Sequence, residues 1–358
     1  MAYTTIDNPE LYFQSVLWTG NGSNPRTITF GGDENMQPDL LWYKCRSHAV
    51  PHILLDSVRT AGNDKELEPN ATTVEGGTSA ETDGYISAFT SDGFTVTTDT
   101  SSDHYVNEGS RTFVAWCWKA GTSFSNDASA TSVGSIDSSG SASSDAGFSI
   151  CSYTGSGSAA TIKHGLSTTP SIVLVKALNS AQRWTMHHKS LGATKIIYLN
   201  ETLAEQDETY FNDTSPTSSV FSVDGSNVTG NTYNYIAYCF AEKQGFSKFG
   251  SFEGNGNADG AFVYTGFRPA FVLAKKSSST GDWGIYNNKS NSYNVMDLRF
   301  KANTNAAEDE SSDNNLDFLS NGFKHRTASG WNASATYIYM AFAEAPFVNS
   351  KGVPCNAR

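Results

Sequence analysis

The chain has 358 residues and a formal net charge of −12, with 17% charged and 12% aromatic residues. This length allows about two or three domains with proper cores, and the composition is typical of a globular β protein rather than a coiled coil or a disordered chain. The acidic balance, without a basic cluster or stripe, argues against nucleic acid and anionic membranes as partners.

Four sequence signals occur in a fixed chain order and then recur twice. They are a Gly-x-Gly turn, a strand that opens with proline and carries a lysine, a Phe-x-x-x-Gly hairpin turn, and a short apolar and aromatic run. The last run is too short to span a membrane and rich in β-forming residues, which predicts a strand covered on both faces. Its copies are FVAWCW (113–118), YIAYCF (235–240) and YIYMAF (337–342).

The recurrence predicts an all-β protein made of three tandem repeats, each a jelly-roll-like β-sandwich of about 100 residues, the usual size of a domain. The three copies of the lysine strand begin at Pro38, Pro170 and Pro269. We divide the chain into an extended leader (1–10), a first repeat (11–121), a Ser/Gly-rich linker (122–146), a second repeat (147–245), a third repeat (246–347) and a C-terminal tail (348–358).

The five cysteines are odd in number and contain no C-x-x-C pair, so neither a disulfide framework nor a zinc site is expected. Cys117 and Cys239 occupy the same place in the repeated run and are interpreted as buried free thiols. The start of the chain lacks the pattern of a secretory leader. We therefore expect synthesis in a reducing cytosol, no membrane insertion, no cofactor and no metal.

Binding residues are expected on the long polar loops, here residues 60–81 and 306–313. Three aromatic residues in loop-like contexts, Tyr85, Tyr210 and Trp331, are the candidates for a sugar-binding platform. Trp184 and Trp283, at matching places in two repeats, are more typical of core residues. No carboxylate pair, nucleophile elbow or histidine cluster predicts catalysis, so a non-enzymatic protein is expected.

The stretch NGNADG contains oxygen-bearing side chains at alternate positions, like the start of a calcium loop. Asn255, Asn257 and Asp259 would be the ligands. The leading aspartate and the closing glutamate of such a loop are missing, and the other repeats carry Gly-x-Gly at the same place. A tight turn is the competing explanation.

Several longer stretches are distinctive, among them AYTTIDNPELYFQ, FVAWCWKAG, YIAYCFAEKQGFSKFGS and the ending YIYMAFAEAPFVNSKGVPCNAR. Together they resemble a family of structural proteins in tailed bacteriophages of marine bacteria, described as tail-fibre or virion structural proteins. The resemblance covers nearly the whole chain and transfers no site residues. It implies a virion protein on the tail or capsid surface, synthesised in the host cytoplasm.

What the resemblance implies leaves three functions open. The first is a tail-fibre or appendage component that contacts a host-surface glycan. The second is a capsid decoration or tail adaptor protein that makes only protein–protein contacts, and the third is a polysaccharide depolymerase. In each case other virion proteins are the expected partners, together with homo-oligomerisation, for which a trimer is the first expectation.

Overall fold

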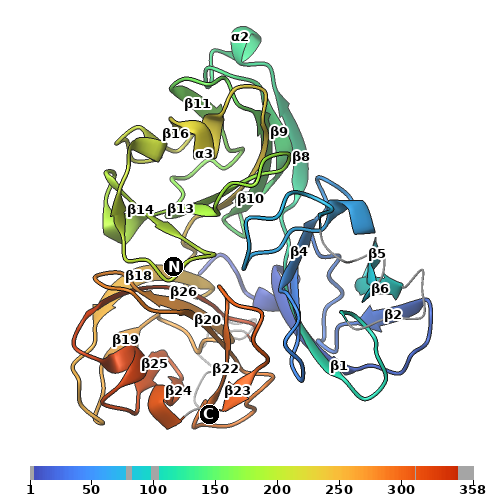
Figure 1. Ribbon diagram of the computed structural model, residues 1–358, viewed down its shortest axis with the longest axis vertical. Helices are drawn as coiled ribbons and strands as arrows, with labels where there is room; N and C mark the ends of the chain where they lie inside the picture. The colour runs from blue at the N-terminus through green and yellow to red at the C-terminus, as the bar shows by residue number, and fades with distance from the viewer. Residues whose placement is uncertain (1–3, 78–82, 98–104, 311, 346–358) are drawn as a thin grey trace.

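The computed structural model describes residues 4–77, 83–97, 105–310 and 312–345. They form antiparallel sheets grouped into three lobes around a common centre (Figure 1). The predicted all-β class is confirmed, because strands make up the described elements apart from a few single-turn helices.

Lobe 1, blue in Figure 1, holds a four-stranded sheet in the order β1-β7-β3-β4 and a three-stranded sheet in the order β2-β6-β5. Its elements are η1 (Pro9–Leu11), β1 (Phe13–Thr19), β2 (Arg26–Thr29), β3 (Leu40–Cys45), β4 (Ile53–Asp56), η2 (Asn63–Lys65), β5 (Tyr85–Thr90), β6 (Gly93–Thr97) and β7 (Thr112–Trp118).

Lobe 2 holds an eight-stranded sheet in the order β15-β14-β13-β12-β17-β10-β9-β8 and the pair β11-β16. Its elements are β8 (Thr122–Asn126), α2 (Ala128–Thr131), β9 (Ser138–Ser143), β10 (Phe148–Thr154), β11 (Ala160–Lys163), β12 (Ile172–Ala177), β13 (Thr185–His188), η3 (Lys189–Leu191), β14 (Lys195–Tyr198), β15 (Gln206–Asp207), η4 (Thr209–Phe211), β16 (Val220–Val223), α3 (Ser226–Thr229) and β17 (Asn234–Phe240).

Lobe 3 holds a six-stranded sheet in the order β18-β26-β20-β21-β22-β23 and a three-stranded sheet in the order β19-β25-β24. Its elements are β18 (Ser247–Glu253), β19 (Phe262–Tyr264), β20 (Phe271–Lys276), β21 (Trp283–Asn287), β22 (Leu298–Lys301), β23 (Asp309–Glu310), η5 (Ser312–Asn314), β24 (Leu316–Leu319), β25 (Gly322–His325), η6 (Gly330–Asn332) and β26 (Thr336–Phe342).

The predicted apolar runs form β7, β17 and β26. In the larger sheets, β7 lies between β1 and β3, β17 between β10 and β12, and β26 between β18 and β20. Both faces of these strands are buried. In β7, Val114, Trp116 and Trp118 belong to a core shared by all three lobes, whereas the alternate residues face the core of lobe 1. The same alternation holds in β17 and β26. This is the period-2 pattern of a strand with an apolar partner on each side.

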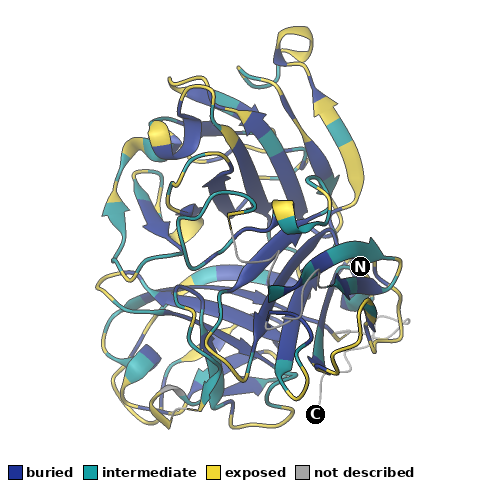
Figure 2. Ribbon diagram, turned by 45° about the vertical axis from the view of Figure 1, so that its right-hand side comes forward, coloured by how far each residue is buried: buried dark blue, intermediate teal, exposed yellow. Residues whose placement is uncertain are grey.

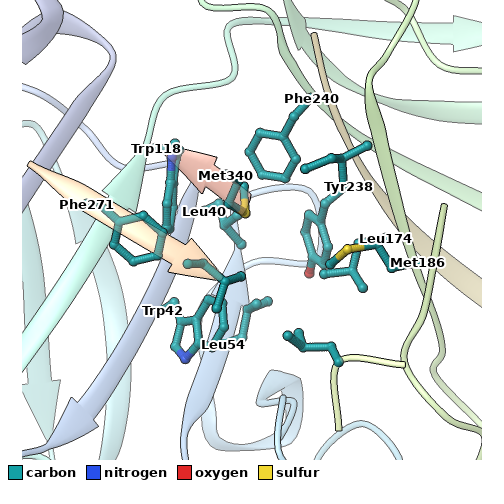
Figure 3. Close-up of a pocket in the computed structure, with 13 residues that line it drawn as sticks. Leu40, Trp42, Leu54, Trp118, Leu174, Met186, Tyr238, Phe240, Phe271 and Met340 are labelled. Atoms are coloured by element: carbon teal, nitrogen blue, oxygen red, sulfur yellow. The ribbon is translucent and has the colours of Figure 1, made fainter. Parts of the chain in front are cut away.

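The shared core is centred on three aromatic rings, one from the end of each of these strands. Trp118, Phe240 and Phe342 are in mutual contact, with ring centroids 5.6 to 6.3 Å apart. Beside them a cavity of only about 20 Å³ remains, lined by apolar residues from all three lobes, as Figure 3 shows. The buried strands therefore converge on a closely packed, apolar centre (Figure 2).

Each lobe also forms a hydrogen bond to another lobe through the lysine of its predicted lysine strand. Lys44, Lys176 and Lys275 are the fifth residues of their strands and are fully buried. Burial lowers the pKa of each ammonium group to about 8. Each donates to a backbone carbonyl of another lobe: Lys176 Nζ to Thr72 O at 3.2 Å, Lys275 Nζ to Thr202 O at 3.3 Å, and Lys44 Nζ to Asn305 O at 3.3 Å.

A ring nitrogen repeats the pattern at, or one residue before, the start of the strand that follows the lysine strand, namely β4, β13 and β21. Trp184 Nε1 donates to Glu68 O at 2.9 Å, and Trp283 Nε1 donates to Tyr198 O at 2.8 Å. Lobe 1 has His52 at this place. Because its Nδ1 accepts from Trp42, the hydrogen-bond network assigns the proton to Nε2, which lies 3.2 Å from Lys301 O. In both sets of contacts, lobe 2 donates to lobe 1, lobe 3 to lobe 2, and lobe 1 to lobe 3.

The long loops 60–81 and 306–313, together with residues 199–205 between β14 and β15 of lobe 2, supply the other half of these junctions. Within each loop a glutamate N–H donates to a backbone carbonyl just after the lysine strand of the neighbouring lobe: Glu75 N to Leu178 O at 2.8 Å, Glu205 N to Ser277 O at 2.9 Å, and Glu308 N to Arg46 O at 2.9 Å. Arg46 and Glu308 also form an ion pair at 2.7 Å. In their described parts, the loops 60–81 and 306–313 thus contact a neighbouring lobe, and the expectation that they present binding residues stays a prediction.

The segment 122–146, expected as a linker, instead adds β8 and β9 to the edge of the lobe 2 sheet. Ser138–Ser143 pairs with β10 in regular antiparallel register. A Cβ atom at Gly140 would lie 1.9 Å from the carbonyl oxygen of Ile150, so only glycine fits there. The small residues that resemble a flexible connector therefore reflect close backbone packing.

The leader also packs against the chain. Ile6 is 2% exposed within the shared core, and the Thr4 hydroxyl donates to Gln244 O. The first three residues and the predicted tail 348–358 lie outside the described residues.

Replacing Lys176 with Met tests the junction between lobes 1 and 2. The carbonyls of Thr72, Ala177 and Gln182 would lose their shared donor inside the protein. We expect the free energy of unfolding to fall by about 2 kcal/mol, measured by urea denaturation. Lys195→Met is the control, because the Lys195 side chain is 35% exposed and its Nζ atom lies 3.9 Å from the Glu205 carboxylate. Equal losses in the two variants would contradict the role of the lysine.

Buried histidines predict loss of stability in mild acid. Burial lowers the pKa of His164, His187 and His325 to about 4 and that of His188 to about 3. In the unfolded chain these histidines bind protons near pH 6.5, whereas in the folded protein they stay neutral down to about pH 4. The free energy of unfolding therefore has its full value above pH 6.5 and falls as the pH drops toward 4. Between these limits His188→Gln should flatten the decline by about 1.4 kcal/mol per pH unit in pH-dependent denaturation. An unchanged slope would contradict a neutral His188 in the folded state.

Candidate functional site

The three aromatic candidates lie in three different lobes and form no common site. Tyr85 is half-buried in β5 of lobe 1, paired with Thr97. Tyr210 is half-buried in η4 of lobe 2, where its ring covers Gly225. Trp331 belongs to η6 of lobe 3. Whatever each residue binds, the three do not make one platform.

Trp331 is a core residue, which corrects the expectation that it is exposed. It is 7% exposed, and its ring meets that of Tyr286 edge to face at 5.5 Å. A Cβ atom at Gly284 would lie 1.2 Å from the Trp331 ring, so the indole fills the space that a side chain on this strand would take. Lobe 2 has the opposite distribution of size, with Val228 at the place of Trp331 and Thr185 at the place of Gly284.

The proposed calcium ligands are occupied in shaping a turn. Asn255 Oδ1 accepts from Asn257 N and from the buried Asn332 amide, and Asn257 Oδ1 accepts from Asp259 N. The Asp259 carboxylate forms an ion pair with Lys324 at 2.6 Å, which lowers its pKa. These contacts match the competing explanation, a tight turn. In the described part of the chain, no group of three or more His, Cys, Asp or Glu residues is placed to hold a metal ion.

The Gly-x-Gly motif of this turn has a backbone reason. A Cβ atom at Gly254 would lie 2.1 Å from the carbonyl oxygen of Ala333, and Gly256 adopts a φ of +62°. The first glycine therefore permits close approach of two backbones, and the second supplies a left-handed conformation. Asn107 secures the corresponding turn of lobe 1 by donating to Asn21 and Ser23.

One polar hollow of about 290 Å³ lies along β8, β9 and β10. Two carboxylates line it, and both support the short helix α2: Asp127 accepts from Ala130 N, and Asp137 accepts from Ala128 N. Hydrogen bonds from Ser129 and Ala130 lower the pKa of Asp127. This hollow contains no exposed aromatic ring, since Tyr153 is 3% exposed.

A larger cleft of about 430 Å³ lies where lobe 2 passes into lobe 3. Polar side chains dominate its lining, which consists of Glu242, Gln244, Gly245, Ser247, Lys248, Tyr264, Thr265 and Gly266. Glu242 accepts from Phe249 N at 2.8 Å and forms ion pairs with Lys189 at 2.6 Å and Lys248 at 3.5 Å. These contacts hold a carboxylate and an ammonium group at fixed places in the cleft.

An exposed aromatic pair lies on β19, and one of its two residues, Tyr264, lines this cleft. Phe262 and Tyr264 lie two residues apart on β19, so both point outward, and they are 46% and 58% exposed. These two residues were not among the candidates predicted from the sequence, because FVY has the pattern of an ordinary strand. A comparison of β19 with β2 and β11 would have indicated them, because the outward positions of those two strands carry polar residues.

A family model for "Domain of unknown function (DUF7483)" matches residues 8–346. The chain belongs to this family. The match spans all three lobes. No curated protein and no solved structure matches the chain.

Within the described residues, the structure has no helix with the length and apolar character needed to cross a membrane.

The Trp331–Gly284 pair makes a double-mutant test of lobe 3. Trp331→Val should lower the free energy of unfolding by about 3 kcal/mol by leaving a cavity, and Gly284→Thr should destabilise by a clash with the indole. The double variant copies lobe 2 and should lose at least about 1 kcal/mol less than the sum of the single losses. Strictly additive losses in thermal or urea unfolding would show that the two places do not share space.

Proposed function

We propose that the chain is made of three tandem repeats of one jelly-roll-like β-sandwich that close into a triangular unit. We further propose that this unit is a non-enzymatic structural protein of a bacteriophage particle. In this proposal it is a tail-fibre or appendage component that attaches to a glycan of the host surface. The observation that carries the proposal is the cyclic set of contacts by which each lobe holds the next.

The repeat proposal is supported by topology as well as sequence. The strand that opens each proposed repeat pairs with the strand that closes it, as in β1 with β7, β10 with β17 and β18 with β26. The next strand of each repeat pairs within the smaller sheet, as in β2 with β6, β11 with β16 and β19 with β25. A buried lysine stands fifth in the third strand of each repeat. Equivalent donors and acceptors then meet at all three junctions.

A closed, three-part unit suits a particle component because its core is formed once and its outer loops are left for contacts. The resemblance of the sequence to phage virion proteins supports a location on the particle, at the tail or the capsid surface. Under this proposal the partners are other virion proteins, further copies of the chain and a host-surface glycan. An oligomer, with a trimer as the first expectation, would be built from these units on the particle.

A polysaccharide depolymerase is less well supported. Glycoside hydrolysis needs a pair of carboxyl groups, one of which has a raised pKa and acts as the acid. In the hollow with two carboxylates, hydrogen bonding lowers the pKa of Asp127 instead. The capsid decoration or adaptor alternative keeps the same fold and differs only in what the unit contacts.

The proposal is tested on the particle itself. Gold-labelled antibodies against the chain should decorate the tail of the phage in electron micrographs. The purified chain should bind host cells and compete with phage adsorption. Label on the capsid together with no competition would favour the decoration protein. Release of new reducing ends from host polysaccharide by the purified chain would favour the depolymerase.

A further inference from the structure

The aromatic pair on β19 can be compared with the residues of β2 and β11, the strands at the corresponding place in lobes 1 and 2. In the three lobes this strand pairs Ile28 with Phe94, Ile162 with Phe221, and Val263 with Phe323. These inward residues are all buried. The strands therefore align without ambiguity, and their outward neighbours can be compared place by place.

The outward places carry polar residues in lobes 1 and 2. They are Thr27 and Thr29 in lobe 1 and Thr161 and Lys163 in lobe 2, against Phe262 and Tyr264 in lobe 3. Two lobes of this molecule thus form the strand without any aromatic side chain there. Because the fold does not require them, two exposed aromatic rings in lobe 3 are better explained by binding than by stability.

The size and the polar lining of the cleft beside Tyr264 limit the chemical classes of ligand that could bind there. The ring lies at the rim of the cleft of about 430 Å³, within the size range of small-molecule sites. The cleft offers a carboxylate, an amide, an ammonium group and hydroxyls, with the Glu242 and Lys248 charges paired to each other. An apolar chain would leave these polar groups without partners, and the net charge of −12 disfavours a polyanion.

We propose that Tyr264, Phe262 and the adjoining cleft form a saccharide-binding site. This inference rests on the proposed function and deepens it by naming the site of glycan attachment. The C–H face of a sugar ring stacks on an aromatic ring, and its hydroxyls both donate and accept hydrogen bonds. The exposed rings and the mixed donors and acceptors of the cleft meet both requirements at one place.

The test uses the full chain and an array of immobilised bacterial surface oligosaccharides. The wild-type chain should bind members of the array. The variant Phe262→Thr/Tyr264→Thr copies the outward residues of lobe 1 and should weaken this binding by about tenfold or more, with an unchanged melting temperature. Tyr293→Thr is the matched control, since it removes an 84% exposed aromatic ring of the same lobe that does not line the cleft.

A second variant keeps the site testable if the double variant fails to fold. Gln244→Ala removes the side-chain amide from the cleft and should also weaken binding, whereas the backbone carbonyl that accepts from Thr4 remains. Binding that survives in both variants would overturn the site while leaving host attachment in place. Failure of the wild-type chain to bind any oligosaccharide would overturn both the site and glycan attachment, although tail labelling would still support the virion role.

A protein ligand is the remaining outcome. If the double variant binds oligosaccharides like the wild type but no longer assembles onto particles, the aromatic pair contacts another virion protein and the saccharide site is rejected. The array and the particle-incorporation assay together therefore assign each result to one conclusion.

Discussion

The fold depends on the burial of one strand per lobe on both faces. A sheet normally packs one face on the core, and a two-layer sandwich covers only that face. Here the second face of β7, β17 and β26 is apolar as well, and it is covered by the other two lobes. Three such faces meet around Trp118, Phe240 and Phe342, so no lobe can remove its second face from water without both neighbours. The lysine, tryptophan and loop contacts then fix how the lobes are oriented around this centre.

The existence of the strands and their double burial could be predicted from the sequence because both are written in local patterns. A run such as FVAWCW has no polar face, and its length excludes a membrane span. What covers the second face could not be predicted, since an apolar side chain does not specify its partner. The contacts of the loops with neighbouring lobes could not be predicted for a related reason. Glu75, Glu205 and Glu308 make their junction contacts through backbone N–H groups, which any residue other than proline possesses.

The fit between a large and a small residue that are far apart in the chain could not be predicted from the sequence either. Trp331 looks exposed in a stretch of Ser, Gly and Asn, and only the structure shows Gly284 making room for its ring. The Ser/Gly-rich segment around Gly140 resembles a linker for the same reason: small residues are required both by flexible connectors and by strands in close contact. Among the candidate residues, local context was therefore least informative where two distant parts of the chain had to fit together.

Placing all three copies of the strand pattern in one polypeptide has a consequence for valency. In an assembly of identical subunits a substitution appears on every subunit, so a surface feature is present as many times as there are subunits. Under the repeat proposal each lobe of this chain can vary by itself, and the outward residues of β2, β11 and β19 differ accordingly. The exposed aromatic pair accordingly occurs once per molecule, and any gain in avidity must come from the number of molecules displayed together.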